Sequence, residues 1–455
     1  MTDKVPLKSR VPREIKDRVR KAIDPEEAIG LCSRLVQINS IVENDAAEEE
    51  IASFVAGKLR DLGLEVRLVD LPEGLGVPDM GKGPHPMVIA RLKGQGEGPV
   101  LMVGGHLDTE PVVDRDLWTH DPFSGDVDRG NGYIYGLGTV NMKQSLASFM
   151  SAIAAIVRSK IRLKGDLLFA ATSQEDLGMI GSRYLVTHWD SLNIGKMPDM
   201  YLGGDQSDCA AWTCNMGLGI FVITTYGRSA HCSSRYIHHP AYRDSYQVNA
   251  ADKMVKILQE LKDVRKTFVY ERGTFLGDPA VCFGKIETKY AGGGGRAALG
   301  VHECKAYVDI RFPAGVSKQS CKRDIERLIY NLSIDDRELR ASVEVAPDIF
   351  GLECGPVIPP KDFPLLDALR LAHREVFGED LVVDTDTNGT TTQRTIDWTR
   401  MAASDVSAFH AAGIPGLNYG PGIVPVTPDE RVSIEQLVKH CAASALTILE
   451  VCGAV

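Results

Sequence analysis

Two kinds of hydrophobic pattern alternate along the first half of the chain. Short runs of consecutive apolar residues predict buried strands, and apolar residues that return every three or four positions predict amphipathic helices. Asp24 and Pro25 form a helix start, in which the aspartate would cap the first turn. The predicted strands cover residues 66–68, 87–89, 100–103, 167–171 and 200–202, and the predicted helices include 51–62 and 146–157. Alternating strands and helices are typical of an α/β fold, with a mostly parallel sheet and helices on both faces.

The pattern changes near residue 216. Elements then follow in the order strand, helix, strand, strand, helix, strand, which is typical of a small two-layer α+β domain. The α/β pattern returns after Pro359–Pro360. The predicted elements of this last part are helix 365–376, strand 381–383, helix 404–412, strand 416–419 and helix 434–451. We therefore expect a first domain formed by residues 1–215 and 357–455, with a second domain, residues 216–356, inserted into it.

Composition and charge narrow the class of protein. The 455 residues exceed the size at which a single core keeps growing, and contents of 44% hydrophobic and 25% charged residues are ordinary for a soluble protein. The net charge of −10 argues against nucleic-acid and anionic-membrane partners. The sequence contains no run of about 18 apolar residues, no apolar signal-peptide core and no CxxC pair among its ten cysteines. We therefore expect a cytoplasmic protein with reduced cysteines, without a membrane span or a thiolate metal site.

Candidate metal ligands lie where the predicted strands end. His106 and Asp108 follow strand 100–103, and a histidine with a carboxylate two residues later can bind an ion and keep the imidazole oriented. Further polar residues follow other strands or turns of the same domain: Asn141, Gln174, Glu175, Asp176, Asp205 and Asp405. Each acid taken alone is more often a helix cap or part of a solvated turn. Because the carboxyl ends of parallel strands meet in one crevice, the shared position of these residues favours a common site.

These motifs, in this order, resemble those of the M20 metallopeptidases, a family of metal-dependent hydrolases. The resemblance runs from about residue 25 to the end of the chain and implies a zinc-exopeptidase-like catalytic domain with an inserted lid and dimerisation domain. Gly105–Thr109 is similar to the first metal motif, Tyr135–Lys143 to the motif of the bridging ligand, and Glu175–Asp176 to the glutamate pair. The roles that the resemblance implies are metal ligands His106, Asn141, Asp176 and Asp205, orienting residue Asp108, and general base Glu175.

Two motifs of the predicted lid extend the resemblance. Gly227–His231 is similar to a segment whose histidine reaches the active site of a partner subunit, which implies that His231 stabilises developing negative charge. Asp309–Arg311 is similar to a strand whose arginine binds a substrate carboxylate, which implies that contact for Arg311. The histidines at 238–239 are alternatives for the lid role, although His231 fits the motif register better. The resemblance therefore implies a homodimer formed through the lid domain.

Four positions depart from the family pattern. Asn141 replaces the bridging aspartate and Val426 replaces the histidine before the closing Pro-Asp-Glu, while Ala298 replaces a lid asparagine and Leu137 a motif arginine. Two of five metal ligands are therefore changed, and a second ion most needs those two. A neutral amide and only two ligand carboxylates would leave two buried divalent ions with a large uncompensated charge. We therefore expect one divalent transition-metal ion. Mn²⁺ and Zn²⁺ are its leading identities, and the types of ligand alone do not determine which metal is bound.

These expectations favour a single-ion hydrolase that cleaves a C–N bond in a small carboxylate-bearing molecule. The pattern resembles in particular the M20-like aminohydrolases that release ammonia from 5-nitroanthranilate, a reaction with no carbonyl oxygen for a second ion to polarise. The polar segment 385–395 is either a wall of the substrate pocket or a solvated loop. One alternative is an amidohydrolase or peptidase that acts on an N-acyl amino acid and recruits another ligand such as His410. The other is a non-catalytic scaffold, which the retained Glu175 and Arg311 argue against.

Overall fold

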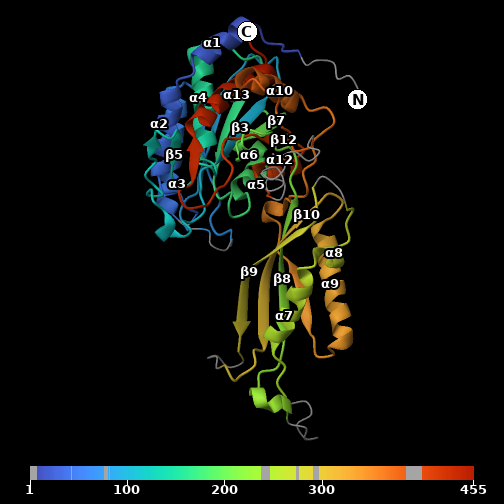
Figure 1. The fold of residues 1–455 in the computed structure, drawn as a ribbon. Coiled ribbons are helices and arrows are strands. Elements are labelled where there is room, and N and C mark those ends of the chain that lie inside the picture. Colours follow the sequence, from blue (N-terminus) through green and yellow to red (C-terminus); the bar gives the residue numbers. More distant parts are fainter. Residues whose placement is uncertain are drawn as a thin grey trace. The chain divides into compact units, whose positions relative to one another are not determined.

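The structure divides into two compact units. It is a computed structural model and describes residues 8–42, 44–75, 80, 82–236, 246–272, 276–290, 297–385 and 402–455. Unit 1 comprises the described parts of Met1–Asn215, Val357–Arg400 and Ser404–Val455, and unit 2 those of Met216–Pro356 and Met401–Ala403. The chain therefore leaves unit 1, builds unit 2 and returns (Figure 1).

Unit 1 is built on a six-stranded sheet. In spatial order its strands are β1 (Glu65–Asp70), β2 (Pro86–Leu92), β6 (Leu167–Thr172), β3 (Leu101–His106), β7 (Met200–Gly203) and β12 (Gly416–Asn418). The strands from β6 to β12 pair in parallel, whereas β1 and β2 pair antiparallel at one edge. The predicted α/β class with a mostly parallel sheet is confirmed. Every residue of β3 and β6 is buried, as continuous apolar runs predict for central parallel strands.

Helices cover both faces of this sheet. They are α1 (Arg13–Lys21), α2 (Pro25–Gln37), α3 (Asp45–Asp61), α4 (Lys143–Arg158), α5 (Ile180–Thr187), α6 (Trp189–Leu192), α10 (Pro364–Phe377), α12 (Asp405–Ala411) and α13 (Ile434–Cys452). Asp24 caps α2 as predicted, because its carboxylate accepts the backbone N–H of Glu26 at 2.9 Å. Helices α4 and α13 contact β3 on one face, and α12 contacts β7 and β12 on the other (Figure 1).

A small sheet and one short 3₁₀ turn complete the described part of unit 1. The sheet has the order β13 (Arg431–Ser433), β5 (Tyr133–Tyr135) and β4 (Val127–Asp128), and a 3₁₀ turn covers Arg115–Leu117. Because β13 pairs with β5, the segment that ends at Glu430 lies beside the turn that follows Tyr135. This pairing brings the closing motif of the chain next to the turn that carries Asn141.

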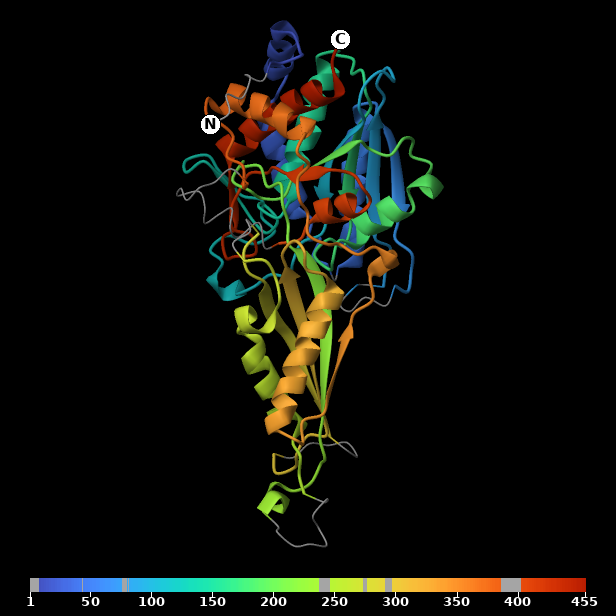
Figure 2. The same cartoon turned by 90° about the vertical axis from the view of Figure 1, so that its right-hand side faces the viewer.

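Unit 2 is a two-layer α+β fold. Its sheet has the order β11 (Ala341–Val345), β8 (Gly217–Tyr226), β10 (Glu303–Phe312) and β9 (Ala280–Lys289), and all pairings are antiparallel. Helices α7 (Ala250–Leu261), α8 (Val264–Thr267) and α9 (Lys318–Asp335) lie along one face (Figure 2). Burial alternates strictly along β10, with the even-numbered residues under the helices and the odd-numbered residues on the uncovered face. Arg311 therefore lies on the uncovered face.

One predicted element is wrong. Residues 381–383 form no strand, and Val383 makes only an isolated bridge to Ala211. Leu381 and Val383 are buried. The apolar pattern therefore predicted their burial correctly, but it did not show whether they pair with a neighbouring strand. None of the helices in the described ranges combines the length and apolar character that a membrane crossing requires.

Candidate metal centre

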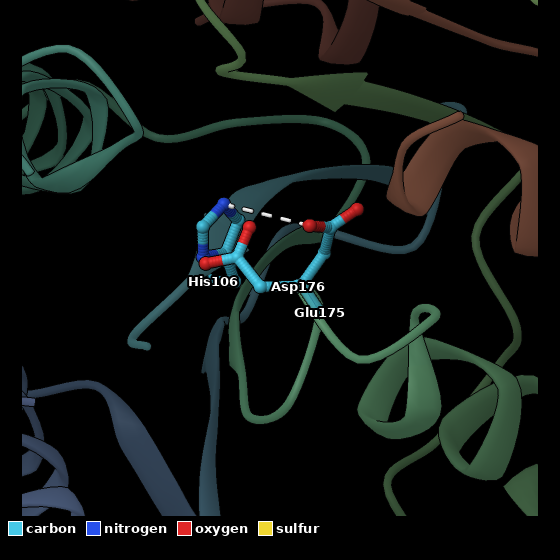
Figure 3. A group of neighbouring side chains, drawn as sticks. All are labelled: His106, Glu175 and Asp176. Carbon is cyan, nitrogen blue, oxygen red and sulfur yellow. Dashed lines mark ion pairs between the residues drawn. The ribbon is translucent and has the colours of Figure 1, made fainter. Parts of the chain in front are cut away.

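His106 is the last residue of β3 and is fully buried. Its Nδ1 atom lies 2.9 Å from the main-chain carbonyl oxygen of Asp108. A carbonyl oxygen only accepts hydrogen bonds, so Nδ1 carries a proton, and Nε2 is the ring atom that can offer a lone pair when the imidazole is neutral. That Nε2 atom lies 3.2 Å from Oδ1 of Asn141. It also lies 3.8 Å from Oε2 of Glu175, the pair that the dashed line joins in Figure 3. Nε2 therefore faces oxygen atoms, which accept its proton when the imidazole is charged and can share a cation with it when the imidazole is neutral.

Asp108 holds the turn that follows β6. Its two carboxylate oxygens accept the backbone N–H groups of Glu175 and Asp176, each at 3.1 Å. The carboxylate lies 3.7 Å from His106 Nδ1, beyond hydrogen-bond distance, so Asp108 orients the imidazole through its main-chain carbonyl. Asp108 thus connects the segment that follows β3 to the segment that follows β6.

Asn141 and Asp176 are linked by a hydrogen bond. Asn141 Nδ2 donates to Asp176 Oδ1 at 3.3 Å, which assigns Oδ1 of the amide to the side that faces His106. Among the described residues, Asp176 Oδ2 is buried without a hydrogen-bond partner. His106, Glu175 and Asp176 each offer a ligand atom, and these atoms lie within 4.8 Å of one another (Figure 3). An orphaned carboxylate oxygen beside an imidazole nitrogen that can bind a metal fits a bound cation.

Two further aspartates belong to the same electrostatic group. Asp205 follows β7 and Asp405 is the first residue of α12, and both are buried. Asp405 Oδ2 accepts a hydrogen bond from the hydroxyl of Thr172 at 3.0 Å. Asp205 lies outside the group that falls within 4.8 Å, but its carboxylate acts on the pKa of His106. The sequence pattern indicated Asp405 at a strand end but assigned it no role.

Burial and charge shift the pKa values of this group in a common direction. Desolvation raises the pKa of the Glu175 and Asp176 carboxyls well above their usual values, and that of Asp205 to about 7. Burial alone would lower the pKa of His106, but the carboxylates of Asp108, Asp176, Glu175 and Asp205 outweigh it and raise that pKa well above its usual value. The buried carboxyls therefore outnumber the cationic groups close to them. The donor set of carboxylates, one amide and one imidazole fits a divalent cation.

Glu430 supports the turn that carries Asn141, and sequence reasoning missed this role. Its Oε1 atom accepts the backbone N–H groups of Gly138 at 2.9 Å and Val140 at 2.8 Å, and its Oε2 atom accepts that of Val426 at 2.7 Å. Burial raises the pKa of Glu430 to about 7. The signal in the sequence was the closing Pro-Asp-Glu motif. Val426 itself has a φ of 51°, in the left-handed region that β-branched residues rarely adopt.

Two predicted functional residues belong to unit 2. His231 is exposed, and its Nδ1 atom lies 2.8 Å from the hydroxyl oxygen of Ser233. Arg311 donates two hydrogen bonds to the carboxylate of Asp309, at 2.9 and 3.0 Å. The alternative lid histidines at 238–239 and nearly all of the polar segment 385–395 lie outside the described residues. His410 is on α12, outside the group formed by His106, Glu175 and Asp176.

Comparison with known proteins assigns the family. The model of peptidase family M20/M25/M40 matches residues 102–450. The chain belongs to this family. It is 26% identical over 441 residues to an N-formyl-4-amino-5-aminomethyl-2-methylpyrimidine deformylase of Bacillus subtilis (strain 168), covering 91% of this chain and 92% of the relative. It is 30% identical over 278 residues to an acetylornithine deacetylase of Photorhabdus laumondii, covering 60% of this chain and 63% of the relative.

Solved structures share the fold of this M20 protein. A dipeptidase from Saccharomyces cerevisiae superposes with a TM-score of 0.70 at 13% identity, covering 96% of this chain and 98% of the other. A Staphylococcus aureus tripeptidase superposes with a TM-score of 0.68 at 18% identity, covering 94% and 98%. The M20 protein is thus a hydrolase that acts on C–N bonds, as the motifs predict, and membership implies the use of a divalent metal. The M20 family resemblance stated from the motifs is confirmed.

Proposed function

We propose that this M20 protein is a single-ion hydrolase that cleaves a C–N bond in a small carboxylate-bearing molecule. The observation that carries the proposal is the 3.2 Å approach of His106 Nε2 to Asn141 Oδ1. In the metal-bound site the cation would replace the Nε2 proton, so that both atoms offer lone pairs to the same point and the cation satisfies both. His106, Asn141, Asp176 and Asp205 would hold that ion, with Mn²⁺ or Zn²⁺ as its leading identities.

Charge supports one ion over two. The position of the family's bridging carboxylate is taken by the neutral Asn141, and Val426 has no ligand atom in its side chain. Asp405 adds a carboxyl to the group. Its Oδ2 atom accepts a hydrogen bond from Thr172 and its Oδ1 atom has no hydrogen-bond partner among the described residues, so it could supply an oxygen ligand but not the nitrogen that Val426 lacks. A second divalent ion would therefore lack both a bridging anion and a nitrogen ligand.

Glu175 would act as the general base. A bound divalent ion lowers the pKa of a water molecule that it holds. Glu175 Oε2 lies 3.8 Å from His106 Nε2, so a proton released there has an acceptor close by. Desolvation raises the pKa of Glu175, which brings it closer to the range suited to proton transfer near neutral pH. Asp108 accepts a hydrogen bond from the backbone N–H group of Glu175 and so would keep the Glu175 carboxylate oriented toward the site.

Unit 2 would supply substrate binding. The guanidinium of Arg311 donates two hydrogen bonds to the carboxylate of Asp309. A substrate carboxylate would compete with Asp309 for the same N–H groups. His231 would stabilise negative charge that develops on the substrate. In the proposed homodimer, the lid domain of one subunit brings His231 to the site of the other.

The substrate that we propose is 5-nitroanthranilate. Water adds to the ring carbon that bears the amine, its proton passes to Glu175, and negative charge moves into the ring and nitro group. Glu175 then returns the proton to the amine nitrogen, the ring C–N bond breaks, and ammonia leaves while the hydroxyl oxygen stays on the ring. The reacting group has no carbonyl oxygen, so the polarising work of a second ion is not needed. An N-acyl or N-formyl compound is the second candidate, because the deformylase relative covers 91% of this chain.

Product analysis separates the two substrates. Protein purified without chelator is incubated with 5-nitroanthranilate, and in parallel with N-formyl and N-acetyl amino acids. Ammonia release that chelation abolishes and Mn²⁺ restores supports the aminohydrolase. Formate or acetate release without ammonia release supports an amidohydrolase instead, and absence of any metal-dependent product excludes all of these substrates.

A further inference from the structure

A second buried carboxylate lies behind the turn that carries Glu175 and Asp176. Glu48 on α3 is fully buried and accepts a hydrogen bond from the side-chain amide of Gln174. Its other oxygen lies 2.6 Å from Nδ1 of His85, which is also buried. Gln174 directly precedes Glu175 in the chain, and its amide nitrogen also donates to the carbonyl of Val42 at 3.2 Å.

This arrangement has two energetic costs. Gln174 has a φ of 59°, a left-handed conformation that is unfavourable for a non-glycine residue. Burial raises the pKa of Glu48 to about 6 despite the opposing contact with His85, so the buried carboxylate is unfavourable for folding. Such costs persist where neighbouring contacts fix one backbone geometry. Here that geometry is the turn from Ser173 to Asp176.

We propose that Glu48 is a positioning residue that acts through Gln174 to keep Glu175 and Asp176 in the geometry that binds the cation. The inference rests on the proposed function, because it assumes that the cation binds beside His106. Asp108 also binds this turn, because its carboxylate accepts hydrogen bonds from the backbone N–H groups of Glu175 and Asp176. The turn is therefore held by Asp108 at its backbone and by Glu48 through the side chain of Gln174.

A purely structural role makes a different prediction. In that case the contact between Glu48 and His85 only attaches α3 to the residue before β2. Loss of Glu48 would then lower thermal stability and leave cation affinity unchanged. Loss of Gln174 would have no effect on affinity either, because its amide would be a passive partner.

Cobalt titration distinguishes these roles without an activity assay. Co²⁺ is added to metal-free protein, and the visible absorbance of the bound ion gives affinity and coordination geometry. We expect Glu48→Ala and Gln174→Ala each to weaken Co²⁺ binding by about tenfold, the effect typical of residues that support metal ligands. The double variant should bind no more weakly than the weaker single variant, because both substitutions remove one connection. Glu48→Gln keeps an oxygen for Gln174 and should retain most of the affinity.

Two controls match these variants. Asp166→Ala removes a carboxylate that pairs with Arg91 at 2.6 Å at the opposite end of β6, and should lower stability without changing Co²⁺ affinity. Glu49→Gln changes the exposed neighbour of Glu48 and should change neither. If Glu48→Ala does not fold, Gln174→Ala carries the test, because it removes only a neutral side chain.

The outcomes separate the positioning role from the proposed function. Failure of the unsubstituted protein to bind Co²⁺ overturns the proposed function and this inference with it. Normal binding by that protein, together with unchanged affinity in Glu48→Ala and Gln174→Ala, overturns only the positioning role. Fully additive losses in the double variant also overturn it, because independent effects cannot pass through one contact.

Discussion

His106 Nε2 lies 3.2 Å from Oδ1 of Asn141, and the other end of the same amide donates to Asp176. An asparagine amide cannot replace the charge of a carboxylate, but its oxygen can still face a cation. The hydrogen bond to Asp176 keeps that oxygen pointed at the imidazole. Asn141 thus preserves the position of a ligand atom while removing one negative charge from the site.

Glu175, the proposed general base, should be needed for turnover but not for metal binding. Glu175→Gln keeps the size of the side chain and an oxygen atom but cannot accept a proton, so turnover should fall by about 10²–10⁴-fold. Metal content should stay unchanged, because the proposed ligands are all present. Steady-state kinetics and elemental analysis of the same sample check both parts, with Glu49→Gln as a control on the exposed face of α3. A near-normal rate in Glu175→Gln would remove this residue from the base role.

Metal removal should have a stability effect that depends on pH. In the metal-free site the pKa of His106 is raised, so its stabilising contribution is present below its unfolded pKa and is lost as pH rises through the folded value. The raised pKa of Asp205, about 7, means that its ionisation also disfavours the folded state as pH rises toward that value. A bound cation favours the neutral imidazole and the ionised carboxylate, which reverses both effects.

The difference in melting temperature between metal-loaded and chelated protein should therefore grow from about pH 5 to about pH 8. Scanning calorimetry in the presence of Mn²⁺ or of chelator measures it. A difference that stays constant across this range would show that these groups do not contact the ion.

Much of the site could be predicted because of where its residues stand in the fold. His106 is the last residue of β3, and Glu175 and Asp205 come shortly after β6 and β7. The carboxyl ends of these parallel strands meet at one edge of the sheet. Asn141 could be included because its motif matches the family. In the same way, the continuous apolar runs of β3 and β6 predicted central strands correctly.

Other parts depend on contacts that no local pattern records. Glu430 meets Gly138 across 292 positions of the chain, and Glu48 meets Gln174 across 126. Neither acid has a neighbour in sequence that explains its burial. The strand predicted at residues 381–383 is wrong for a related reason. Three apolar residues indicate burial, but they do not indicate whether a neighbouring strand pairs with them.

Glu430 should be important for both stability and metal binding. Glu430→Ala leaves the backbone N–H groups of Gly138, Val140 and Val426 without their acceptor, at about 1–3 kcal/mol for each group that stays unsatisfied. Urea denaturation should show a loss in the free energy of unfolding within that range or above it. Cation affinity should fall as well, because Asn141 follows this turn. Unchanged stability would mean that other acceptors replace the carboxylate.

Val426 offers a test of the ion count. Val426→His restores a nitrogen ligand and relieves a β-branched residue with a φ of 51°, so it should raise thermal stability slightly. It should still bind one ion, because Asn141 supplies no bridging charge. The double variant Asn141→Asp/Val426→His should bind two, as measured by elemental analysis. A second ion in the single variant would contradict the charge argument.

The most direct test of the central claim is the number of metal ions per chain in protein purified without chelator, measured by elemental analysis against protein concentration. We expect one divalent ion per chain, and we expect the His106→Ala variant to lose it. Two ions per chain in the unsubstituted protein would contradict this expectation, because the site would then hold a cation for which Asn141 and Val426 provide no charge and no ligand.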